Sequence, residues 1–293
     1  MQSALFYGSG VALVTPFSRG KVDLEALRGL IDWQIEEMTD AIVVLGTTGE
    51  PCTLTPAERI EVIECAVANV AGRVPLLVGA GSNNTAAAVE YARQAQALGA
   101  DGLLVVTPYY NKASRRGLLE HFYAVADSVE IPVIAYNVPG RTGVNLMPEV
   151  AAELLKHPML RGVKEASGDL KQMTRLAALC PGAALYSGSD EHTYAMMALG
   201  GRGVISVAAN ILPQSMHELT AAYLSGEVEL SRERQFALLE IIDLLFCEVS
   251  PVPVKAALAM MGRIRDELRL PLAPLDAARR ERLRAAMEAL ALL

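Results

Sequence analysis

The sequence is poor in cysteine and holds no closely spaced cysteine pair. Its four cysteines are far apart along the chain: Cys52, Cys65, Cys180 and Cys247. A Cys-x-x-Cys pair is the usual sequence signature of a zinc cage or of a redox-active dithiol. We therefore predict neither kind of site and expect reduced thiols in the protein interior.

Positive charge is also scarce. The 293 residues include 26 lysines and arginines against 33 aspartates and glutamates, for a formal net charge of −7. Nucleic acids and anionic membranes bind clustered positive charge, so neither partner is expected. The first residues lack a basic segment followed by an apolar run, and no apolar stretch is long enough to span a bilayer. We therefore expect a cytoplasmic protein without a secretory signal.

Apolar side chains, in contrast, are abundant. Hydrophobic residues make up 52% of the chain and charged residues 20%, which is enough apolar material for a large core. Eight short apolar runs bounded by turn residues predict β-strands. They cover residues 10–14, 41–45, 75–79, 102–107, 132–137, 162–165, 184–187 and 203–207. Most of them lack strict polar alternation, which is typical of a parallel sheet covered on both faces.

Helical patterns separate these strands. Asp23 and Thr55 are predicted helix N-caps, Thr55 in a capping box with Glu58, and Gly99 is a predicted helix stop. Successive strands begin about 19 to 34 residues apart, the length of one strand with one crossover helix. Eight such units predict an α/β fold, the (β/α)8 TIM barrel. The rival is a doubly wound open sheet, but its usual Gly-x-Gly-x-x-Gly turn after the first strand is missing.

The helical patterns after the eighth strand exceed what a barrel needs. They cover residues 212–224, 231–249, 254–261 and 275–293, and only the first is required to complete the barrel. We therefore predict a catalytic (β/α)8 barrel at residues 1–226 and a C-terminal helical extension at residues 227–293 that serves assembly.

Reactive groups in such barrels lie at the C-terminal ends of the strands and in the loops that follow. The eight segments of this kind contain no histidine and no two carboxylates placed as metal ligands, so no metal is expected. The loop after the seventh strand carries Asp190 and Glu191, which would repel a phosphate. A small carboxylate is therefore a better substrate candidate than a sugar phosphate.

Lys164 lies near the end of the sixth predicted strand, beside Val163 and Glu165. Alternation alone does not decide whether the lysine or the glutamate points into the barrel. An inward lysine would lose hydration, its pKa would fall, and its neutral amine could attack a ketone to form a Schiff base. The alternative is a strand-end lysine whose ammonium reaches solvent.

Tyrosines follow two of the neighbouring strands. Tyr136 ends the fifth strand, where its phenol could carry protons beside an imine on Lys164. The alternative is a core aromatic with a satisfied hydroxyl. Tyr109 and Tyr110 follow the fourth strand, and two adjacent tyrosines in a loop are either a packing anchor or a contact at an interface.

Two groups are candidates for binding carboxylates. The turn at residues 46–49 offers backbone N–H groups and the hydroxyls of Thr47 and Thr48, unless it is a tight turn chosen for packing. Arg141, after the fifth strand, is the only arginine or lysine besides Lys164 in the eight segments. It could clamp a second carboxylate, or lie solvated in its loop.

Five segments, in order along the chain, resemble the dihydrodipicolinate synthase family of the pyruvate Schiff-base aldolase superfamily. They are Gly46-Thr-Thr-Gly-Glu50, Thr107-Pro-Tyr-Tyr-Asn111, Tyr136-Asn-Val-Pro-Gly-Arg-Thr142, Gly162-Val-Lys-Glu-Ala-Ser-Gly168 and Gly203-Val-Ile-Ser-Val207. The resemblance runs over the full length, including the helical C-terminus. It implies a lyase that condenses pyruvate with L-aspartate 4-semialdehyde to 4-hydroxy-tetrahydrodipicolinate, in the diaminopimelate route to lysine.

The resemblance also implies catalytic roles for the matching residues. Lys164 would form the Schiff base with pyruvate, Tyr136 would relay protons, and Thr47 with Tyr110 would complete the relay. Tyr110 would reach into the site of a neighbouring subunit, in a homotetramer built from tight dimers. No metal or cofactor would be needed, because the cationic imine is itself the electron sink.

Four further residues would bind the substrates. By the same resemblance, Thr48 would hold the pyruvate carboxylate, and Arg141 would orient the carboxylate of the semialdehyde. Gly188 and Ile205 would line the pocket. N-acetylneuraminate lyase and 2-keto-3-deoxy sugar-acid aldolases keep the lysine and the tyrosine and remain alternatives, although their segment after the tyrosine differs. A non-catalytic small-molecule sensor on the same barrel is a further alternative.

The sequence departs from the pattern of lysine-inhibited members of this family. Those members typically carry small and histidine residues after the Gly-Thr-Thr-Gly-Glu segment and a glutamate in the helix after the third strand. The corresponding places are occupied here by Pro51, Cys52, Pro56, Arg59 and Ala87, while Asn83 and Tyr109 are kept. We therefore expect weak or absent feedback by lysine.

Overall fold

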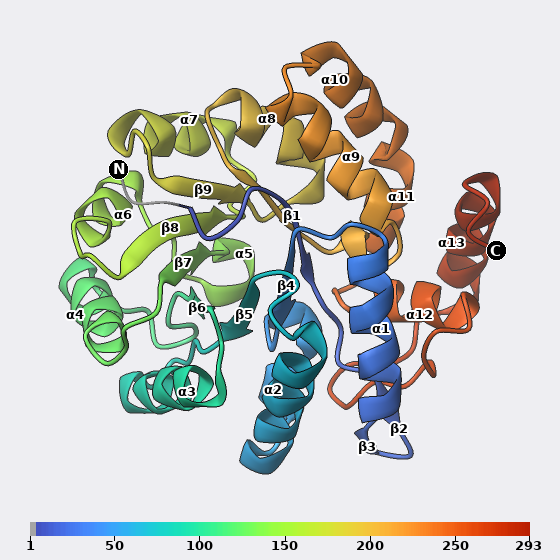
Figure 1. Cartoon of the computed structure of the whole chain (residues 1–293), viewed down its shortest axis with the longest axis horizontal. Helices are drawn as coiled ribbons and strands as arrows, with labels where there is room; N and C mark the ends of the chain where they lie inside the picture. The colour runs from blue at the N-terminus through green and yellow to red at the C-terminus, as the bar shows by residue number, and fades with distance from the viewer. Residues whose placement is uncertain (1–3) are drawn as a thin grey trace.

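Eight parallel strands close into a barrel in the computed structural model, which describes residues 4–293. Going around the barrel, the strands follow the order β1-β10-β9-β8-β7-β6-β5-β4 (Figure 1). Their bounds are β1 Gly8–Ala12, β4 Ala41–Val44, β5 Leu76–Gly79, β6 Gly102–Val106, β7 Val133–Asn137, β8 Leu160–Glu165, β9 Ala184–Ser187 and β10 Gly203–Ser206. All eight predicted runs form barrel strands, which confirms the predicted (β/α)8 fold.

The first strand is shifted toward the N-terminus relative to the prediction. β1 ends at Ala12, although the apolar run continues to Val14. The side chain of Asn210 explains the early end, because its amide donates to the Ala12 carbonyl at 2.8 Å and accepts from the Val14 N–H at 3.1 Å. A side chain from the loop after β10 thus replaces the strand ladder at this point.

Helices cover the outside of the barrel (Figure 1). They are α1 Leu24–Glu36, α2 Pro56–Val70, α3 Thr85–Leu98, α4 Arg115–Ala126, α6 Pro148–Leu154, α7 Leu170–Leu179, α8 Thr193–Ala198 and α9 Pro213–Leu224. The predicted caps are confirmed. Asp23 accepts from the Ala26 N–H at 3.0 Å, Thr55 and Glu58 form the capping box, and Gly99 ends α3 with φ 102°. Short elements that were not predicted include β2 Phe17–Ser18, β3 Lys21–Val22 and α5 Pro139–Thr142.

Apolar side chains form two separate clusters, one inside the barrel and one between the strands and the helices. Alternate residues of each strand enter the two clusters, so Ile134 and Tyr136 of β7 point inward while Val133 and Ala135 point outward. Phe6, which precedes β1, stacks on Tyr186 with ring centroids 4.4 Å apart and accepts a 2.8 Å hydrogen bond from its hydroxyl. The N-terminal end of the barrel is therefore filled.

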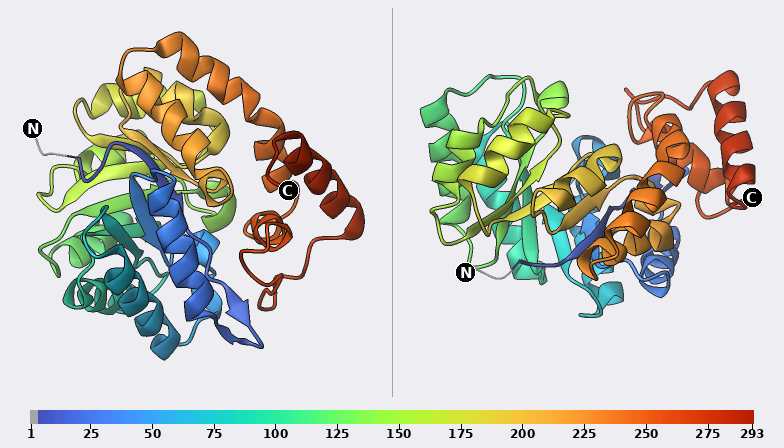
Figure 2. Two further views of the ribbon diagram at one scale, coloured as in Figure 1. Left: turned by 45° about the vertical axis from the view of Figure 1, so that its right-hand side comes forward. Right: turned by 90° about the horizontal axis from the view of Figure 1, so that it is seen from above.

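The chain after the barrel forms α10 Val228–Ala237, α11 Leu239–Leu245, α12 Val252–Met260 and α13 Ala277–Ala289. The prediction of one helix over residues 231–249 is wrong, because the helix breaks at Leu238. The break lets α10 pack on α9 while α11 turns and buries Ile241 and Ile242. Figure 2 shows α12 and α13 together on one side of the barrel. None of the helices in residues 4–293 is long and apolar enough to cross a membrane.

Candidate active site

Lys164 points into the barrel, which settles the choice that alternation had left open. Its side chain is 4% exposed, whereas Val163 belongs to the cluster beneath the outer helices. Glu165 has the same parity as Val163, and its carboxylate accepts from Asn137 Nδ2 at 3.0 Å and from Gln172 Nε2 at 3.2 Å. The glutamate is therefore fixed between strand and helix, and the lysine is the inward group.

The surroundings of Lys164 favour its neutral amine. Burial lowers the pKa of Lys164 to about 7; the positive charge of Arg141 acts in the same direction, and the negative charge of Asp190 opposes it. The ammonium takes part in none of the ion pairs found among residues 4–293. A large fraction of the amine is thus unprotonated, and therefore nucleophilic, near neutral pH.

Tyr136 lies beside Lys164 at the same level of the barrel. The two residues pair in register between β7 and β8, and Lys164 Nζ is 4.3 Å from the centre of the Tyr136 ring. Burial raises the pKa of the phenol, while the positive charge of Arg141 and a hydrogen bond with the Thr47 side chain act against that rise. The phenol is therefore protonated at neutral pH and can donate a proton to a group formed on Lys164.

Thr47 and Thr48 lie in a short 3-10 turn, η1 Thr47–Gly49, directly after β4. The chain turns sharply at Leu45, whose φ of 56° lies in the left-handed region. The neighbouring strand accommodates this turn only because residue 79 is glycine, since a Cβ there would lie 1.9 Å from the Leu45 carbonyl oxygen. The sequence thus presents two adjacent hydroxyls at the C-terminal end of the barrel.

A cavity of about 570 Å³ connects these groups. Six of the predicted site residues contribute to its walls: Lys164, Tyr136, Thr47, Thr48, Arg141 and Gly188. The amine, phenol, hydroxyls and guanidinium therefore line one cavity, which can hold a small ketone and transfer protons to and from it. The single chain alone accounts for this arrangement.

Gly188 and Ile205 have different relations to the cavity. A Cβ at Gly188 would lie 3.0 Å from Lys164 Cε and 2.6 Å from the Ala166 Cβ, so the glycine leaves space for the lysine side chain. Ile205 is fully buried in the cluster inside the barrel. The cavity wall after β10 is formed by Val207, so the binding role of Ile205 stays a prediction.

Arg141 lies in α5 and marks the boundary between two cavities. Its Nη2 donates to the Ser250 carbonyl at 3.0 Å, which fixes the guanidinium against the C-terminal segment. A second cavity, of about 520 Å³, shares Thr47, Tyr136 and Arg141 with the first and extends to Arg59. A carboxylate at this junction would meet the arginine and the Thr47 hydroxyl together.

Tyr110 is not brought to the cavity within one chain. Its ring is 87% exposed, and its backbone N–H donates to the Thr142 carbonyl at 3.1 Å with φ 72°. The adjacent Tyr109 lines the second cavity instead. The predicted role of Tyr110 therefore needs a second chain.

Sequence reasoning missed the contribution of the C-terminal helices. Ile242 and Asp243 of α11, Phe246 directly after that helix, and Ser250 line the same cavity as Lys164. No local pattern marks them, because they belong to an amphipathic helix whose placement depends on the break at Leu238. Residues 4–293 contain no group of three or more histidine, cysteine, aspartate or glutamate side chains arranged to hold a metal ion.

Comparisons with known proteins place this arrangement in a family. The model of the dihydrodipicolinate synthetase family matches residues 5–290. The 4-hydroxy-tetrahydrodipicolinate synthase of Alkaliphilus oremlandii (strain OhILAs) is 50% identical over 280 residues, 95% of this chain and 97% of that protein. The crystal structure of the Thermotoga maritima dihydrodipicolinate synthase has a TM-score of 0.97 at 42% identity, covering 99% of this chain and 100% of that one. The chloride-inhibited dihydrodipicolinate synthase of Acinetobacter baumannii, complexed with pyruvate, gives 0.96 at 42% identity, with 98% and 99% covered.

Proposed function

The chain belongs to the dihydrodipicolinate synthetase family, and from this premise we propose the reaction that it catalyses. It is a lyase that condenses pyruvate with L-aspartate 4-semialdehyde to give 4-hydroxy-tetrahydrodipicolinate, in the diaminopimelate route to lysine. The observation that carries the proposal is the buried pair of Lys164 and Tyr136, side by side on adjacent strands in one cavity.

The first half of the reaction takes place on Lys164. Its neutral amine adds to the keto carbon of pyruvate, a carbon–nitrogen bond forms, and the carbonyl oxygen leaves as water. Tyr136 donates a proton to that leaving oxygen, and the Thr47 hydroxyl, bonded to the phenol, passes a proton on. Lys164 and pyruvate are then joined by a cationic imine.

The second half uses the imine as an electron sink. Loss of a proton from the pyruvate methyl group gives an enamine, whose carbon attacks the aldehyde carbon of the semialdehyde. The amino group of the semialdehyde then adds to the imine carbon, closes the ring and releases Lys164 as a free amine. The imine nitrogen accepts an electron pair when the methyl proton leaves and again when the amino group adds, and the aldehyde oxygen takes up a proton to become the hydroxyl of the product, so the chemistry requires no metal and no cofactor.

Each substrate carboxylate is held by its own group of donors. The Thr48 hydroxyl and the N–H groups of its turn bind the pyruvate carboxylate. Arg141, at the junction of the two cavities, orients the carboxylate of the semialdehyde. Gly188 leaves room for the Lys164 side chain, and Ile205, buried inside the barrel, lines the pocket.

Assembly completes the site in this proposal. The exposed ring of Tyr110 enters the cavity of a neighbouring subunit and extends the proton relay, in a homotetramer built from tight dimers. Residues 1–226 form the catalytic barrel and residues 227–293 its helical extension. The enzyme works in the cytoplasm.

Reductive trapping tests the reaction. We expect borohydride with pyruvate to add one pyruvate-derived group to the intact protein, at Lys164 when peptides are sequenced by mass spectrometry. The Lys164→Ala variant is the matched control and should stay unmodified. An unmodified wild-type Lys164 would refute the mechanism. Turnover of aspartate semialdehyde without turnover of N-acetylneuraminate then identifies the aldehyde.

A further inference from the structure

Lys255 lies in α12, far along the chain from the catalytic strands, yet it is buried beside Glu50, the residue that follows the Thr47–Gly49 turn. Its Nζ donates to Glu50 Oε1 at 2.6 Å and to the Thr15 carbonyl at 3.0 Å. Thr15 in turn donates its hydroxyl to the Gly49 carbonyl at 2.7 Å. Because Gly49 and Glu50 are adjacent, these contacts close a ring, the Lys255 ring, formed by Lys255, Thr15, Gly49 and Glu50.

The ring fixes the end of the turn that carries the two catalytic-site hydroxyls. The Glu50 N–H donates to the Thr47 carbonyl at 3.2 Å, which closes the turn. Glu50 has φ 51° and ψ 43°, a left-handed conformation that residues with a Cβ rarely adopt. Something must hold such a residue in place, and here its buried carboxylate is tied to Lys255.

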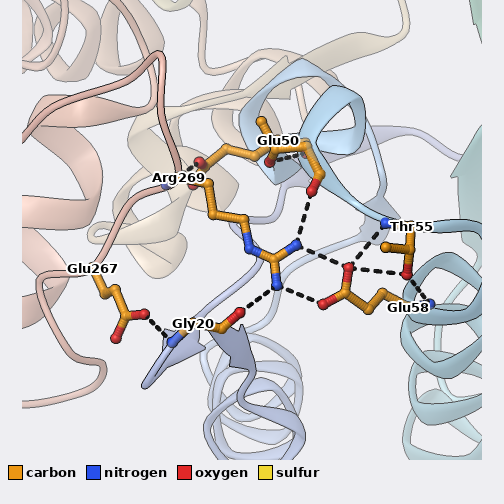
Figure 3. Close-up of polar contacts among 7 residues, drawn as sticks. Gly20, Glu50, Thr55, Glu58, Glu267 and Arg269 are labelled. Atoms are coloured by element: carbon orange, nitrogen blue, oxygen red, sulfur yellow. Dashed lines mark hydrogen bonds and ion pairs between the residues drawn. The ribbon is translucent and has the colours of Figure 1, made fainter.

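The second oxygen of the Glu50 carboxylate has a different partner, Arg269. Figure 3 shows the Arg269 side chain reaching toward Glu58 and Gly20, with Glu50 beside the Arg269 backbone. The backbone N–H of Arg269 donates to Glu50 Oε2 at 3.3 Å. The Arg269 guanidinium donates to both carboxylate oxygens of Glu58 and to the Gly20 carbonyl. The Glu267 carboxylate accepts from the Gly20 N–H at 2.5 Å. The segment after α12 therefore adds a second contact to Glu50, at the end of the turn.

Stability is a poor explanation for the burial of this ion pair. The side chains of Lys255 and Glu50 are 0% and 1% exposed, and the ammonium lies 4.2 Å from the centre of the Phe17 ring. Removing two charges from water costs free energy that their attraction often fails to recover, so apolar substitutes are frequently as stable. In some proteins such a pair instead specifies one defined geometry.

We propose that Lys255 and Glu50 are positioning residues of the active site, which set the Thr47–Thr48 turn for pyruvate binding and proton relay. The proposal rests on the proposed function, because it takes these two threonines as the carboxylate and relay groups. In this proposal the C-terminal segment helps to position the active-site groups, although Lys255 itself touches no substrate. An imprecisely placed turn would still fold, but its hydroxyls would miss the pyruvate carboxylate and the Tyr136 phenol.

Variants that open the ring in two different ways test the proposal. The double variant Lys255→Met/Glu50→Gln removes both charges together, so no unpaired charge remains buried. Thr15→Val removes the hydrogen bond from the Thr15 hydroxyl to the Gly49 carbonyl with little change of side-chain volume. It leaves the ion pair between Lys255 and Glu50 intact. Arg234→Met is the matched control, because it breaks an ion pair with Glu218 that joins α9 and α10.

Each variant is measured as the full-length assembled enzyme. The readouts are the melting temperature, the pyruvate concentration that gives half-maximal borohydride trapping, and kcat with both substrates. In the double variant we expect the half-saturating pyruvate concentration to rise about tenfold or more while trapping at saturating pyruvate still reaches Lys164. Thr15→Val should raise the half-saturating pyruvate concentration by a smaller factor, and Arg234→Met should leave this concentration unchanged.

The outcomes separate this proposal from the proposed function. If wild-type Lys164 is not trapped at all, the proposed function fails and this proposal fails with it. If the wild type is trapped, and a folded double variant or a folded Thr15→Val variant keeps the wild-type half-saturating concentration and kcat, only the positioning role is overturned. A purely structural role predicts that result, with a lower melting temperature alone.

Discussion

Lys164 and Tyr136 occupy the same level of two neighbouring strands, with the lysine Nζ 4.3 Å from the centre of the tyrosine ring. The barrel imposes this relationship, because paired residues of adjacent parallel strands point to the same side of the sheet. A nucleophile and a proton donor are thereby fixed by backbone hydrogen bonds rather than by mobile loops.

Removing only the phenol should separate proton transfer from imine formation. In Tyr136→Phe the ring stays packed beside Lys164, but no acidic group remains to protonate the leaving oxygen. We expect kcat to fall by about 10²- to 10⁴-fold, in the range of a lost general acid. Slow trapping by borohydride at saturating pyruvate should persist, because Lys164 is intact. Wild-type kcat in this variant would show that another group carries the proton.

The pH dependence of trapping should report the lysine itself. Burial and Arg141 lower the pKa of Lys164 to about 7. Below that pH the amine is protonated and cannot attack, so the trapping rate at subsaturating pyruvate should rise with pH and be half-maximal near 7. A midpoint close to the ordinary lysine value would contradict the buried environment.

Substituting Asp190 tests the direction in which a neighbouring charge shifts the pKa of Lys164. Burial raises the pKa of the Asp190 carboxyl, while hydrogen bonds from the Val207 and Ala208 N–H groups, at 3.1 and 2.9 Å, oppose that rise and favour the carboxylate. The negative charge of this carboxylate raises the pKa of Lys164. Asp190→Asn keeps the shape and removes the charge, so the midpoint of the trapping profile should move to lower pH. A shift to higher pH would mean that Asp190 does not act on Lys164 through its charge.

Gly188 should be intolerant of a methyl group for a steric reason. The added Cβ of Gly188→Ala would lie 2.6 Å from the Ala166 Cβ and 3.0 Å from Lys164 Cε. We expect a loss of about 1–3 kcal/mol in the free energy of unfolding and slower trapping, because the lysine is displaced. Gly29→Ala in α1 is the control, since its Cβ would meet nothing within 4 Å. Equal trapping rates in both variants would show that Lys164 does not need the space at residue 188.

Hybrid oligomers should reveal whether Tyr110 acts across an interface. Lys164→Ala and Tyr110→Phe chains are each expected to be nearly inactive alone. A hybrid dimer of the two has one complete site, built from Lys164 of one chain and Tyr110 of the other, and should recover about half of the wild-type activity. Coexpression with two affinity tags isolates the hybrid for a steady-state assay. No recovery in a purified hybrid would show that Tyr110 does not act across the interface, and wild-type activity of Tyr110→Phe alone would place Tyr110 outside the relay.

The barrel strands could be predicted from the sequence because each is a local apolar run between turn residues. The direction of Lys164 could not, since both it and Glu165 are polar and a strand end can point either one inward. Only the packing of Glu165 against Asn137 and Gln172 decides the matter.

The Lys255 ring lies beyond local sequence reasoning for a different reason. Lys255 and Glu50 are 205 positions apart, and Lys255 and Thr15 are 240 apart. No periodicity links such residues, and the sequence analysis took the whole C-terminal extension as an element of assembly. Its contacts with the Thr47–Gly49 turn become visible only when the tertiary structure brings the segments together.

Inhibition of the enzyme by lysine should be weak or absent. The structure gives a physical reason for this, in addition to the sequence differences from lysine-inhibited members of the family. Arg59 is 5% exposed, its guanidinium lies 4.1 Å from the centre of the Tyr91 ring, and Nη2 donates to the Gly79 carbonyl at 3.0 Å. This fixed cation lines the second cavity beside Cys52 and Tyr109. A lysine molecule entering there would bring its own ammonium against the guanidinium, at a cost that increases as water is excluded. Steady-state rates at saturating substrates should therefore be unchanged by added L-lysine, and half-inhibition at submillimolar lysine would refute the expectation.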